Sequence, residues 1–180
     1  EVRFLDIDKD ALIKKLLSGG AEDFGEDFLK EIIFYDKDLK WQYEEKKFVR
    51  IRQTNKGVFV TFKNQQEETA TGTREIETKV EDFNNMKEIL KEIGLFAYRE
   101  QEKKRHTFKL DGVMVDIDTW PSVPTYVEFE GPSEESLKRV SRKLGFNWSD
   151  AIFKAPRFII EERYKIPLSK LRFFTFDKIE

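Results

Sequence analysis

The stretch FVRIRQTNKGVFVTFK, residues 48–63, decides how the fold is interpreted. In it Arg50 and Arg52 alternate with apolar side chains, and a period of two is typical of a β-strand with one polar and one apolar face. Residues 54–57, Thr-Asn-Lys-Gly, form turns readily and separate this strand from a second one, in which Lys63 lies on the polar face. The stretch therefore predicts a β-hairpin with basic side chains on one surface.

Charged residues repeat at the same spacing of two in other segments with strand-like alternation. A single charged face is ordinary in an antiparallel sheet, where that face meets water. Most of these pairs, however, carry like charges that repel each other, whereas a solvated face more often mixes signs. The sign also changes from strand to strand, so a closing sheet would bring carboxylates opposite guanidinium groups. The segments concerned carry Glu1 and Arg3, Glu75 and Glu77, Lys103 and Arg105, Asp116 and Asp118, and Glu128 and Glu130.

Three amphipathic helices are predicted between the strands, from apolar periodicity over residues 11–17, 83–93 and 137–144, each followed by glycine. Such helices need an apolar surface to cover, and the Val, Ile and Phe faces of the strands provide one. Helices outside leave the charged faces turned inward. The sequence thus predicts an α+β fold, an antiparallel closed β-barrel or tunnel with a polar lumen and helices packed outside. The predicted strands are 1–5, 28–35, 48–53, 58–63, 71–80, 96–110, 113–118 and 125–130.

Composition limits the class of protein. With 180 residues, of which 39% are hydrophobic, a single folded domain over residues 1–180 is expected. The 33 basic and 35 acidic residues leave a net charge of −2, so no overall field would steer the protein to nucleic acid or to an anionic membrane. The sequence contains neither a membrane-spanning apolar run nor a signal peptide. The absence of Cys excludes disulfides and thiolate metal sites and fits a reducing compartment, so we expect a cytoplasmic protein.

An interior lined with charge must pair its ions or bind a ligand, because burying unpaired charges is costly. Clusters of Arg and Lys suit phosphate oxygens, which Arg can bind in bidentate fashion. Since His106 is the only histidine, a metal site would be built mainly from carboxylates, which suit Mg²⁺ or Mn²⁺. Both sets of side chains in one cavity predict a metal-bound polyphosphate site.

Some features are left without a functional role. The tail after Trp148 contains a predicted helix near 152–163 and an apolar stretch, 168–176. It would cap the barrel, close one mouth of the tunnel or pair with another subunit, so a homodimer stays open. The indole rings of Trp41 and Trp120 are expected to pack in loops or in the core rather than to stack on a base.

The ordered set of short motifs resembles the CYTH, or triphosphate tunnel metalloenzyme, superfamily over about residues 1–145. That group includes class IV adenylyl cyclases, thiamine triphosphatases and inorganic triphosphatases. Glu1-Val2-Arg3 is similar to the end of its opening motif E-x-E-x-K, with Arg3 at the position of Lys and the first Glu before Glu1. In chain order, Arg50-Ile51-Arg52 is similar to the R-x-R strand, Thr61-Phe62-Lys63 to the next basic strand, Arg74-Glu75-Ile76-Glu77 to the R-E-x-E strand, Lys103 and Arg105 to a later basic strand, Asp118 to the motif Asp, and Glu128-Phe129-Glu130-Gly131 to the last E-x-E-G.

The resemblance implies an eight-stranded antiparallel tunnel that depends on Mg²⁺ or Mn²⁺ and acts on tripolyphosphate, ATP or thiamine triphosphate. Hydrolysis of an inorganic or organic triphosphate is favoured, since it needs only the phosphate cradle and a water. A class IV adenylyl cyclase, which converts ATP to cyclic AMP and pyrophosphate, and a non-catalytic nucleotide or polyphosphate binding module are the alternatives. The implied substrate ligands are Arg3, Arg50, Arg52, Lys63, Lys103 and Arg105, the implied metal ligands are Glu1, Asp118, Glu128 and Glu130, and the implied catalytic residues are Arg3, Glu75 and Glu77.

Overall fold

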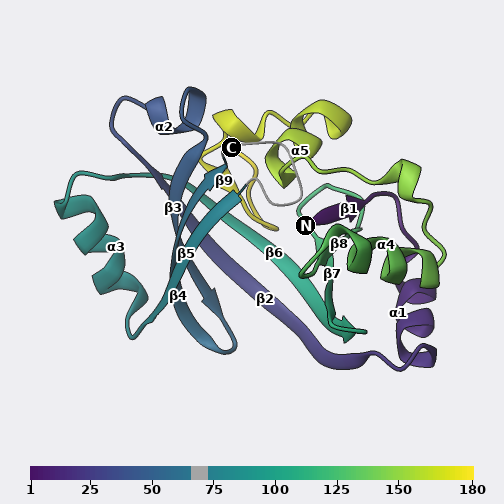
Figure 1. The fold of residues 1–180 in the computed structure, drawn as a ribbon. Helices are drawn as coiled ribbons and strands as arrows, with labels where there is room; N and C mark the ends of the chain where they lie inside the picture. Colours follow the sequence, from purple (N-terminus) through teal and green to yellow (C-terminus); the bar gives the residue numbers. More distant parts are fainter. Residues whose placement is uncertain (66–72) are drawn as a thin grey trace.

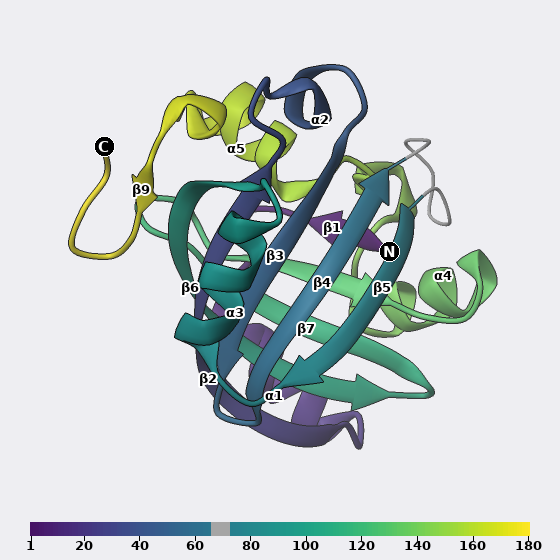
Figure 2. The same cartoon turned by 90° about the vertical axis from the view of Figure 1, so that its left-hand side faces the viewer.

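A long antiparallel sheet curls into a half-barrel in the computed structural model, which describes residues 1–65 and 73–180 (Figure 1). The strand order is β1-β8-β7-β6-β2-β3-β4-β5. Because of the curl, β3, β4 and β5 stand in front of β7 when the molecule is seen from the side (Figure 2). The strands are β1 (Val2–Phe4), β2 (Glu22–Tyr35), β3 (Lys47–Thr54), β4 (Gly57–Gln65), β5 (Thr73–Val80), β6 (Phe96–Leu110), β7 (Val113–Thr119) and β8 (Tyr126–Glu130).

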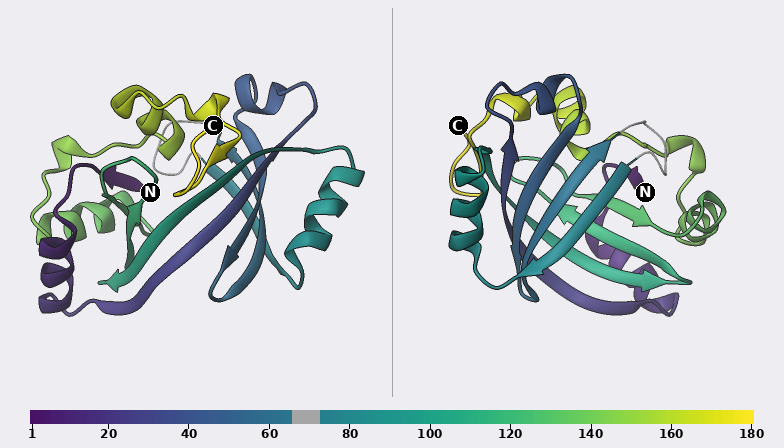
Figure 3. Two further views of the ribbon diagram at one scale, coloured as in Figure 1. Left: turned by 180° about the vertical axis from the view of Figure 1, so that it is seen from behind. Right: turned by 60° about the vertical axis from the view of Figure 1, so that its left-hand side comes forward.

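Three helices, α1 (Lys9–Ser18), α3 (Phe83–Glu92) and α4 (Glu134–Lys143), lie on the outer surface of the sheet (Figure 3). Each helix has an N-cap residue whose side chain accepts a hydrogen bond from a backbone N–H of the first turn. These residues are Asp8, Asp82 and Ser133. The expected α+β fold, with an antiparallel sheet of eight strands that curls and helices packed outside, is confirmed, but the sheet forms a half-barrel and not the closed barrel expected from the sequence.

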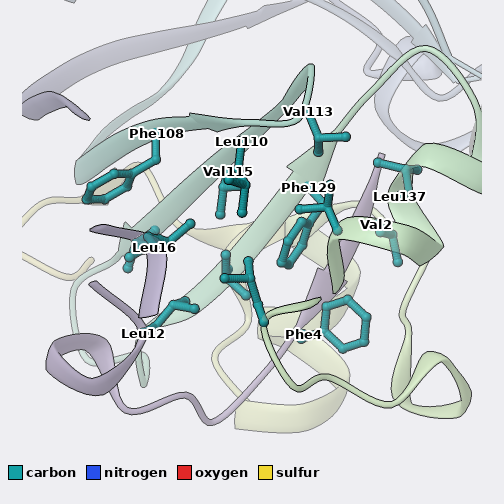
Figure 4. Packing of buried hydrophobic residues seen from close by; sticks show 14 residues of the cluster. Val2, Phe4, Leu12, Leu16, Phe108, Leu110, Val113, Val115, Phe129 and Leu137 are labelled. Atoms are coloured by element: carbon teal, nitrogen blue, oxygen red, sulfur yellow. The ribbon is translucent and has the colours of Figure 1, made fainter. Parts of the chain in front are cut away.

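The apolar faces of the strands form the core under these helices. Leu16 of α1 and Leu137 of α4 pack with Phe108, Val115 and Phe129 of the sheet in one buried cluster (Figure 4). A second cluster joins α3 to the apolar faces of β2, β3 and β4, and its buried members are Ile32, Phe34, Val49, Ile51, Val58 and Leu90. Because the apolar side chains are buried on the convex side of the sheet, under the helices, the charged side chains that alternate with them lie on the concave side.

The strand path ends at β1 on one edge and at β5 on the other. In residues 1–65 and 73–180 no ladder joins these two strands, so the sheet curls without a closing ladder. The free side of β1 is already occupied, because the backbones of Arg3 and Ile152 exchange two hydrogen bonds of 2.9 Å. The connection after α4 therefore blocks the pairing that a fully closed barrel would need.

Several elements differ in extent from the sequence prediction. β2 begins at Glu22 instead of near Phe28, since its first half pairs with the far end of β6. The predicted strand start at Thr71 lies outside the described residues. A short helix, α2 (Lys40–Tyr43), was not predicted, because four residues carry no periodicity.

The tail forms short elements on one end of the half-barrel. The helix predicted near 152–163 begins later, as α5 (Pro156–Tyr164), with Pro156 at its first position. Two 3₁₀ turns, η1 (Trp148–Asp150) and η2 (Leu168–Lys170), flank it, and β9 (Phe173–Phe174) then pairs parallel to β6. Nowhere in the described part of the chain is a helix both long and apolar enough to cross a membrane.

Candidate functional site

One cavity of about 370 Å³ lies on the charged, concave side of the sheet. Among the lining residues that the structure describes, ten are basic and six are acidic, so the cavity favours an anion. Asp118 is not part of the lining but is fully buried beside it. The sequence-predicted residues that the structure brings together around this cavity are Arg3, Arg50, Arg52, Lys63, Lys103, Arg105, Glu1, Glu75, Glu77, Glu128 and Glu130.

The strand register explains why opposite charges meet in this cavity. Arg3 of β1 stands opposite Glu128 of β8, and Arg105 of β6 stands opposite Asp118 of β7. Such cross-strand neighbours lie close enough for their side chains to interact. The alternation of sign from strand to strand, visible in the sequence, thus becomes a set of ion pairs.

The first network of ion pairs surrounds Glu128. The Nη2 atom of Arg3 lies 2.6 Å from Glu128 Oε2 and 2.7 Å from Glu1 Oε1, while its Nη1 donates to the carbonyl of Lys154. The Nη2 atom of Arg105 lies 3.3 Å from Glu128 Oε1. Burial alone would raise the pKa of Glu128, but the two guanidinium groups hold it well below its usual range.

Asp118 anchors the basic side chains of β6. It accepts hydrogen bonds from Lys103 Nζ at 2.8 Å and from Arg105 Nε at 2.6 Å, and both donors line the cavity. Burial, followed by the neighbouring charge of Arg105, lowers the pKa of Lys103 to about 8. Asp118 therefore fixes the position of two cations whose charge faces the cavity.

A second network is centred on Glu31, which the sequence analysis did not identify. Glu31 is 3% exposed, and its carboxylate accepts hydrogen bonds from Arg52 Nε at 2.6 Å and from Gln101 Nε2 at 2.5 Å. Arg50 Nη1 lies 3.6 Å from it. Burial would raise the pKa of Glu31, but Arg52 and Arg50 hold it below its usual range.

The carboxylates of β5 complete the wall opposite β8. Lys63 Nζ lies 2.7 Å from Glu75 Oε2, and Glu77 Oε2 accepts a hydrogen bond of 2.7 Å from Thr61 Oγ1. Arg50 Nη2 is 3.8 Å from Glu75 and 3.9 Å from Glu77. These two carboxylates are exposed, so they are available to a ligand in the cavity.

The carboxylates of Glu1, Glu128 and Glu130, at the β1–β8 edge, provide the oxygen donors that a hard divalent cation prefers. Burial, then the neighbouring charges of Glu128 and Glu1, raise the pKa of Glu130, so these groups lie within each other's field. In the described residues no three carboxylates already form a metal cage. Glu1 and Glu128 instead form ion pairs with Arg3. Their oxygens fit Mg²⁺ or Mn²⁺, and binding such an ion would replace these ion pairs with metal–oxygen contacts.

Buried polar atoms without partners also mark the cavity. Within residues 1–65 and 73–180, three buried side-chain polar atoms have no hydrogen-bond partner, and all belong to residues that line it. Two are the Nε atoms of Arg3 and Arg50, and the third is Oε1 of Gln42. Natural folds rarely leave such groups unsatisfied, and here they cluster at one place. The cavity is thus built with spare polar capacity.

Some lining residues were missed or set aside in the sequence analysis. Arg99 and Gln101 continue the odd-numbered face of Lys103 and Arg105 along β6, so extending that alternation would have found them. Trp41 and Trp120 pack in core clusters, as expected, and they also line the cavity. The tail contributes further lining residues, whose position no periodicity in the sequence reveals.

A second cavity, of about 190 Å³, shares Arg52, Arg105 and Glu77 with the first. Its other walls come from the β3–β4 turn and the bulged part of β2, including Asn55 and Gly25. The same charged side chains thus face two hollows of the half-barrel.

Comparison with known proteins agrees with this architecture. A protein of Methanocaldococcus jannaschii, named provisionally as an adenylate cyclase, is 29% identical over 126 residues, which cover 68% of this chain and 70% of that protein. The solved structure of a provisionally named adenylate cyclase from Vibrio parahaemolyticus has a TM-score of 0.73 at 12% identity and covers 89% of this chain and 95% of that one. A Hippeastrum protein, described with a dominant triphosphatase activity, has a TM-score of 0.62 at 13% identity, with coverages of 89% and 93%.

The CYTH domain family matches residues 1–151, a segment that includes β1 to β8 and the charged pairs around the cavity. Because this match spans most of the chain and agrees with the fold, the chain belongs to the CYTH domain family.

Proposed function

We propose that this chain is a divalent-metal-dependent enzyme that hydrolyses a triphosphate. The observation that carries the proposal is the cavity of about 370 Å³, in which ten basic side chains outnumber six acidic ones among the described lining residues. A triphosphate has the charge and the row of oxygens to use this excess, and phosphoryl transfer depends mainly on positioning and charge neutralisation.

The substrate would be held by exchange of partners. Arg50 and Arg52 share one buried carboxylate, Glu31, so part of their donor capacity is open to phosphate oxygens. Arg3 and Arg105 form a second pair of guanidinium groups, which share the carboxylate of Glu128. We assign the phosphate chain to the space between these two pairs, with Lys63 and Lys103 as further contacts, as the family resemblance implies.

The metal would be held by Glu1, Glu128 and Glu130, with Asp118 acting through the cations that it positions. When bound, Mg²⁺ or Mn²⁺ would neutralise charge on the phosphate oxygens and lower the pKa of a water ligand. Asp118 is fully buried and bonded to Lys103 and Arg105, which favours a positioning role for it over direct ligation.

The chemical step needs a water aligned with the bond that breaks. We assign this task to the exposed carboxylates of Glu75 and Glu77, which would accept a hydrogen bond from the water. The water oxygen forms a bond to the terminal phosphorus while one of its protons passes to the carboxylate that accepts its hydrogen bond, the bond from that phosphorus to the bridging oxygen breaks, and the diphosphate leaves with its electron pair. Arg3 would stabilise the charge that develops, since its guanidinium stays protonated throughout.

The proposal is tested by incubating the purified protein with Mg²⁺ or Mn²⁺ and, separately, tripolyphosphate, ATP and thiamine triphosphate. Release of orthophosphate that EDTA abolishes is the expected result. Binding of all three without any product over hours would instead make the chain a non-catalytic binding module. Absence of binding would remove the triphosphate site altogether.

Adenylyl cyclisation is the second candidate, and the name of the Methanocaldococcus jannaschii relative favours it. In that reaction the ribose 3′-hydroxyl oxygen forms a bond to the α-phosphorus and pyrophosphate leaves. The same phosphate cradle would serve both reactions. Cyclic AMP and pyrophosphate from ATP, in place of orthophosphate, would decide for the cyclase.

Arg52→Ala is expected to weaken binding of tripolyphosphate by about 10- to 100-fold, the loss of a hydrogen bond to a charged group worth roughly 1.5–3 kcal/mol. Orthophosphate, which cannot reach as many donors, should lose much less. Isothermal calorimetry measures both, and Arg142→Ala on the exposed face of α4 serves as the matched control. Equal losses for the two anions would mean that Arg52 does not contact the outer phosphates.

Lys103 is expected to take up protons when a triphosphate binds. Its pKa of about 8 means that roughly half of the side chains lack the proton at pH 8, and a bound anion would raise this pKa. Binding at pH 8 should therefore consume about half a proton, and at pH 6 none at this site. Calorimetry in two buffers of different ionisation enthalpy measures the uptake. A Lys103→Arg variant with unchanged uptake would assign the protons to another group.

A further inference from the structure

Two cations that line the cavity form no ion pair with any residue that the structure describes. They are Arg99 of β6 and Arg157 of α5. Other basic lining residues, such as Arg52 and Arg105, are each held by a buried carboxylate. The excess of basic over acidic side chains in the cavity therefore lies in part at Arg99 and Arg157.

Arg99 is a buried cation whose printed hydrogen bonds all go to neutral acceptors. It is 4% exposed, and its guanidinium donates hydrogen bonds of 2.8 Å to Gln101 Oε1 and 2.9 Å to the carbonyl of Leu168. Burial lowers the pKa of Arg99, and the neighbouring charge of Arg157 lowers it further. Burying a charge without an opposite charge is costly, so a bound anion would stabilise this arrangement. The guanidinium also has more N–H donors than these two bonds use.

Arg157 lies in the first turn of α5, at the end of the half-barrel where α2 also lies (Figures 1 and 2). The N-cap residue Ala155 makes no side-chain capping bond, and it lines the cavity together with Pro156 and Arg157. The Cζ atom of Arg157 lies 4.6 Å from the centre of the Phe158 ring, which carries no negative charge. The start of α5 thus adds a guanidinium and the positive end of a helix dipole to the charge of Arg99.

Gln42 of α2 provides an unpaired hydrogen-bond acceptor beside these cations. It lines the cavity and is 1% exposed, and its Oε1 has no hydrogen-bond partner in residues 1–65 and 73–180. Its Nε2 donates to the carbonyl of Ser169 at 2.9 Å, which fixes the orientation of the amide because a carbonyl only accepts. Ser169 follows Leu168, whose carbonyl accepts from Arg99, so Gln42 and Arg99 bond to adjacent residues. Both cation and acceptor are therefore present at one place.

The strands separate this place from the cations assigned to the triphosphate. On the same face of β6, Arg99 precedes Lys103 by four residues and Arg105 by six, about 13 Å and about 20 Å at the usual rise of a strand. Arg50 and Arg99 both pair with Ile33, so their strands lie about 10 Å apart across β2. The Nη2 atom of Arg50 donates to Thr61 of β4, on the far side of β3 from Arg99.

A phosphate group matches the chemistry of these side chains. Its charged oxygens suit guanidinium groups, which bind them in bidentate fashion. Orthophosphate also keeps an O–H group at neutral pH that can donate to Gln42 Oε1, whereas an ionised carboxylate has no such donor. We propose that Arg99, Arg157 and Gln42 form a second anion site, which binds a phosphate group separately from the two arginine pairs assigned to the triphosphate. The site goes beyond the proposed function, because binding there does not depend on hydrolysis.

The test follows orthophosphate binding by NMR with ¹⁵N-labelled protein in EDTA, which prevents metal-dependent turnover. The side-chain Nε–H signal of Arg99, assigned by its loss in Arg99→Lys, is expected to shift in a saturable way as orthophosphate is added. Arg157→Ala should weaken this binding by about tenfold, which corresponds to the loss of a hydrogen bond to a charged group. Arg52→Ala, in the triphosphate site, should change it by less than about twofold.

Arg163→Ala is the matched control, since Arg163 also belongs to α5 but is exposed, pairs with Asp6 and does not line the cavity. The absence of an Arg99 response, or equal effects of Arg157→Ala and Arg163→Ala, would overturn the proposal. Equal losses in Arg52→Ala and Arg157→Ala would overturn it too, because they would place the orthophosphate in the triphosphate site. A wild-type protein that shows the Arg99 response but does not bind tripolyphosphate would reject the proposed function and leave the second site standing.

The phosphate group has two sources, free orthophosphate or the last group of a linear polyphosphate longer than three units. Titrations of tripolyphosphate and tetrapolyphosphate into Arg157→Ala distinguish them. If the longer chain reaches the second site, binding of tetrapolyphosphate weakens by about tenfold and that of tripolyphosphate by less than about twofold. If free orthophosphate is the ligand, both chains bind to the variant as they do to the wild type. A loss of about tenfold for tripolyphosphate would assign Arg157 to the triphosphate site and overturn the proposal.

Discussion

Replacing Glu130 by Gln is expected to lower kcat for triphosphate hydrolysis by at least about a hundredfold while leaving the thermal stability unchanged. The carboxylate is exposed at the edge of the cavity and makes no hydrogen bond or ion pair with any residue that the structure describes. Burial and the charges of Glu128 and Glu1 raise its pKa, so its negative charge does not stabilise the fold. We therefore expect this carboxylate to act in ligand binding.

The measurement is a steady-state assay of orthophosphate release with increasing Mn²⁺, together with a thermal melt of the same samples. Glu135→Gln, an exposed carboxylate on α4, is the matched control and should behave as the wild type. If excess Mn²⁺ restores part of the activity, the variant has lost metal affinity. Near-normal turnover at low Mn²⁺ would place Glu130 outside the site.

Alternation at a spacing of two predicted both the fold and most of the charged site. Arg50 and Arg52 could be assigned to one face because apolar neighbours needed the other, and the helices needed those neighbours as a covered surface. The same reasoning placed Glu128 and Glu130 on the concave side. This pattern works because strand side chains point alternately to the two faces, whatever the partner strand is.

Features that depend on how distant segments meet could not be predicted. In the sequence, Glu31 is a single acidic residue beside an apolar run. Only the pairing of β2 with β3 and β6 shows that its carboxylate accepts hydrogen bonds from both Arg52 and Gln101. The edge of β1 is blocked by Ile152, a contact between residues far apart in the sequence. Trp41 could not be placed in the cavity either, because it lies on the short helix α2, which no periodicity in the sequence reveals.

Replacing Glu31 by Gln is expected to lower the free energy of unfolding of the ligand-free protein by about 3 kcal/mol, because it leaves the buried guanidinium of Arg50 and the half-buried one of Arg52 without their shared carboxylate. Burial and Arg52 have already lowered the pKa of Arg50 to about 10, so the site tolerates further positive charge poorly. In the wild type, burial would raise the pKa of the Glu31 carboxyl, but Arg52 and Arg50 hold it below its usual value of 4.5. Its contribution is therefore complete above about pH 4.5 and is lost as the pH falls further.

The same variant is expected to bind tripolyphosphate more tightly than the wild type does, since the anion no longer competes with Glu31 for Arg50 and Arg52. Thermal melts with and without tripolyphosphate measure both effects, because a ligand raises stability by an amount that grows with its affinity. Glu92→Gln on the exposed face of α3 controls for the change in net charge. A destabilised variant whose melting temperature rises no more than that of the wild type would show that the freed arginines do not face the phosphate chain. An undiminished stability in the absence of ligand would show that the Glu31 network does not hold the two strands together.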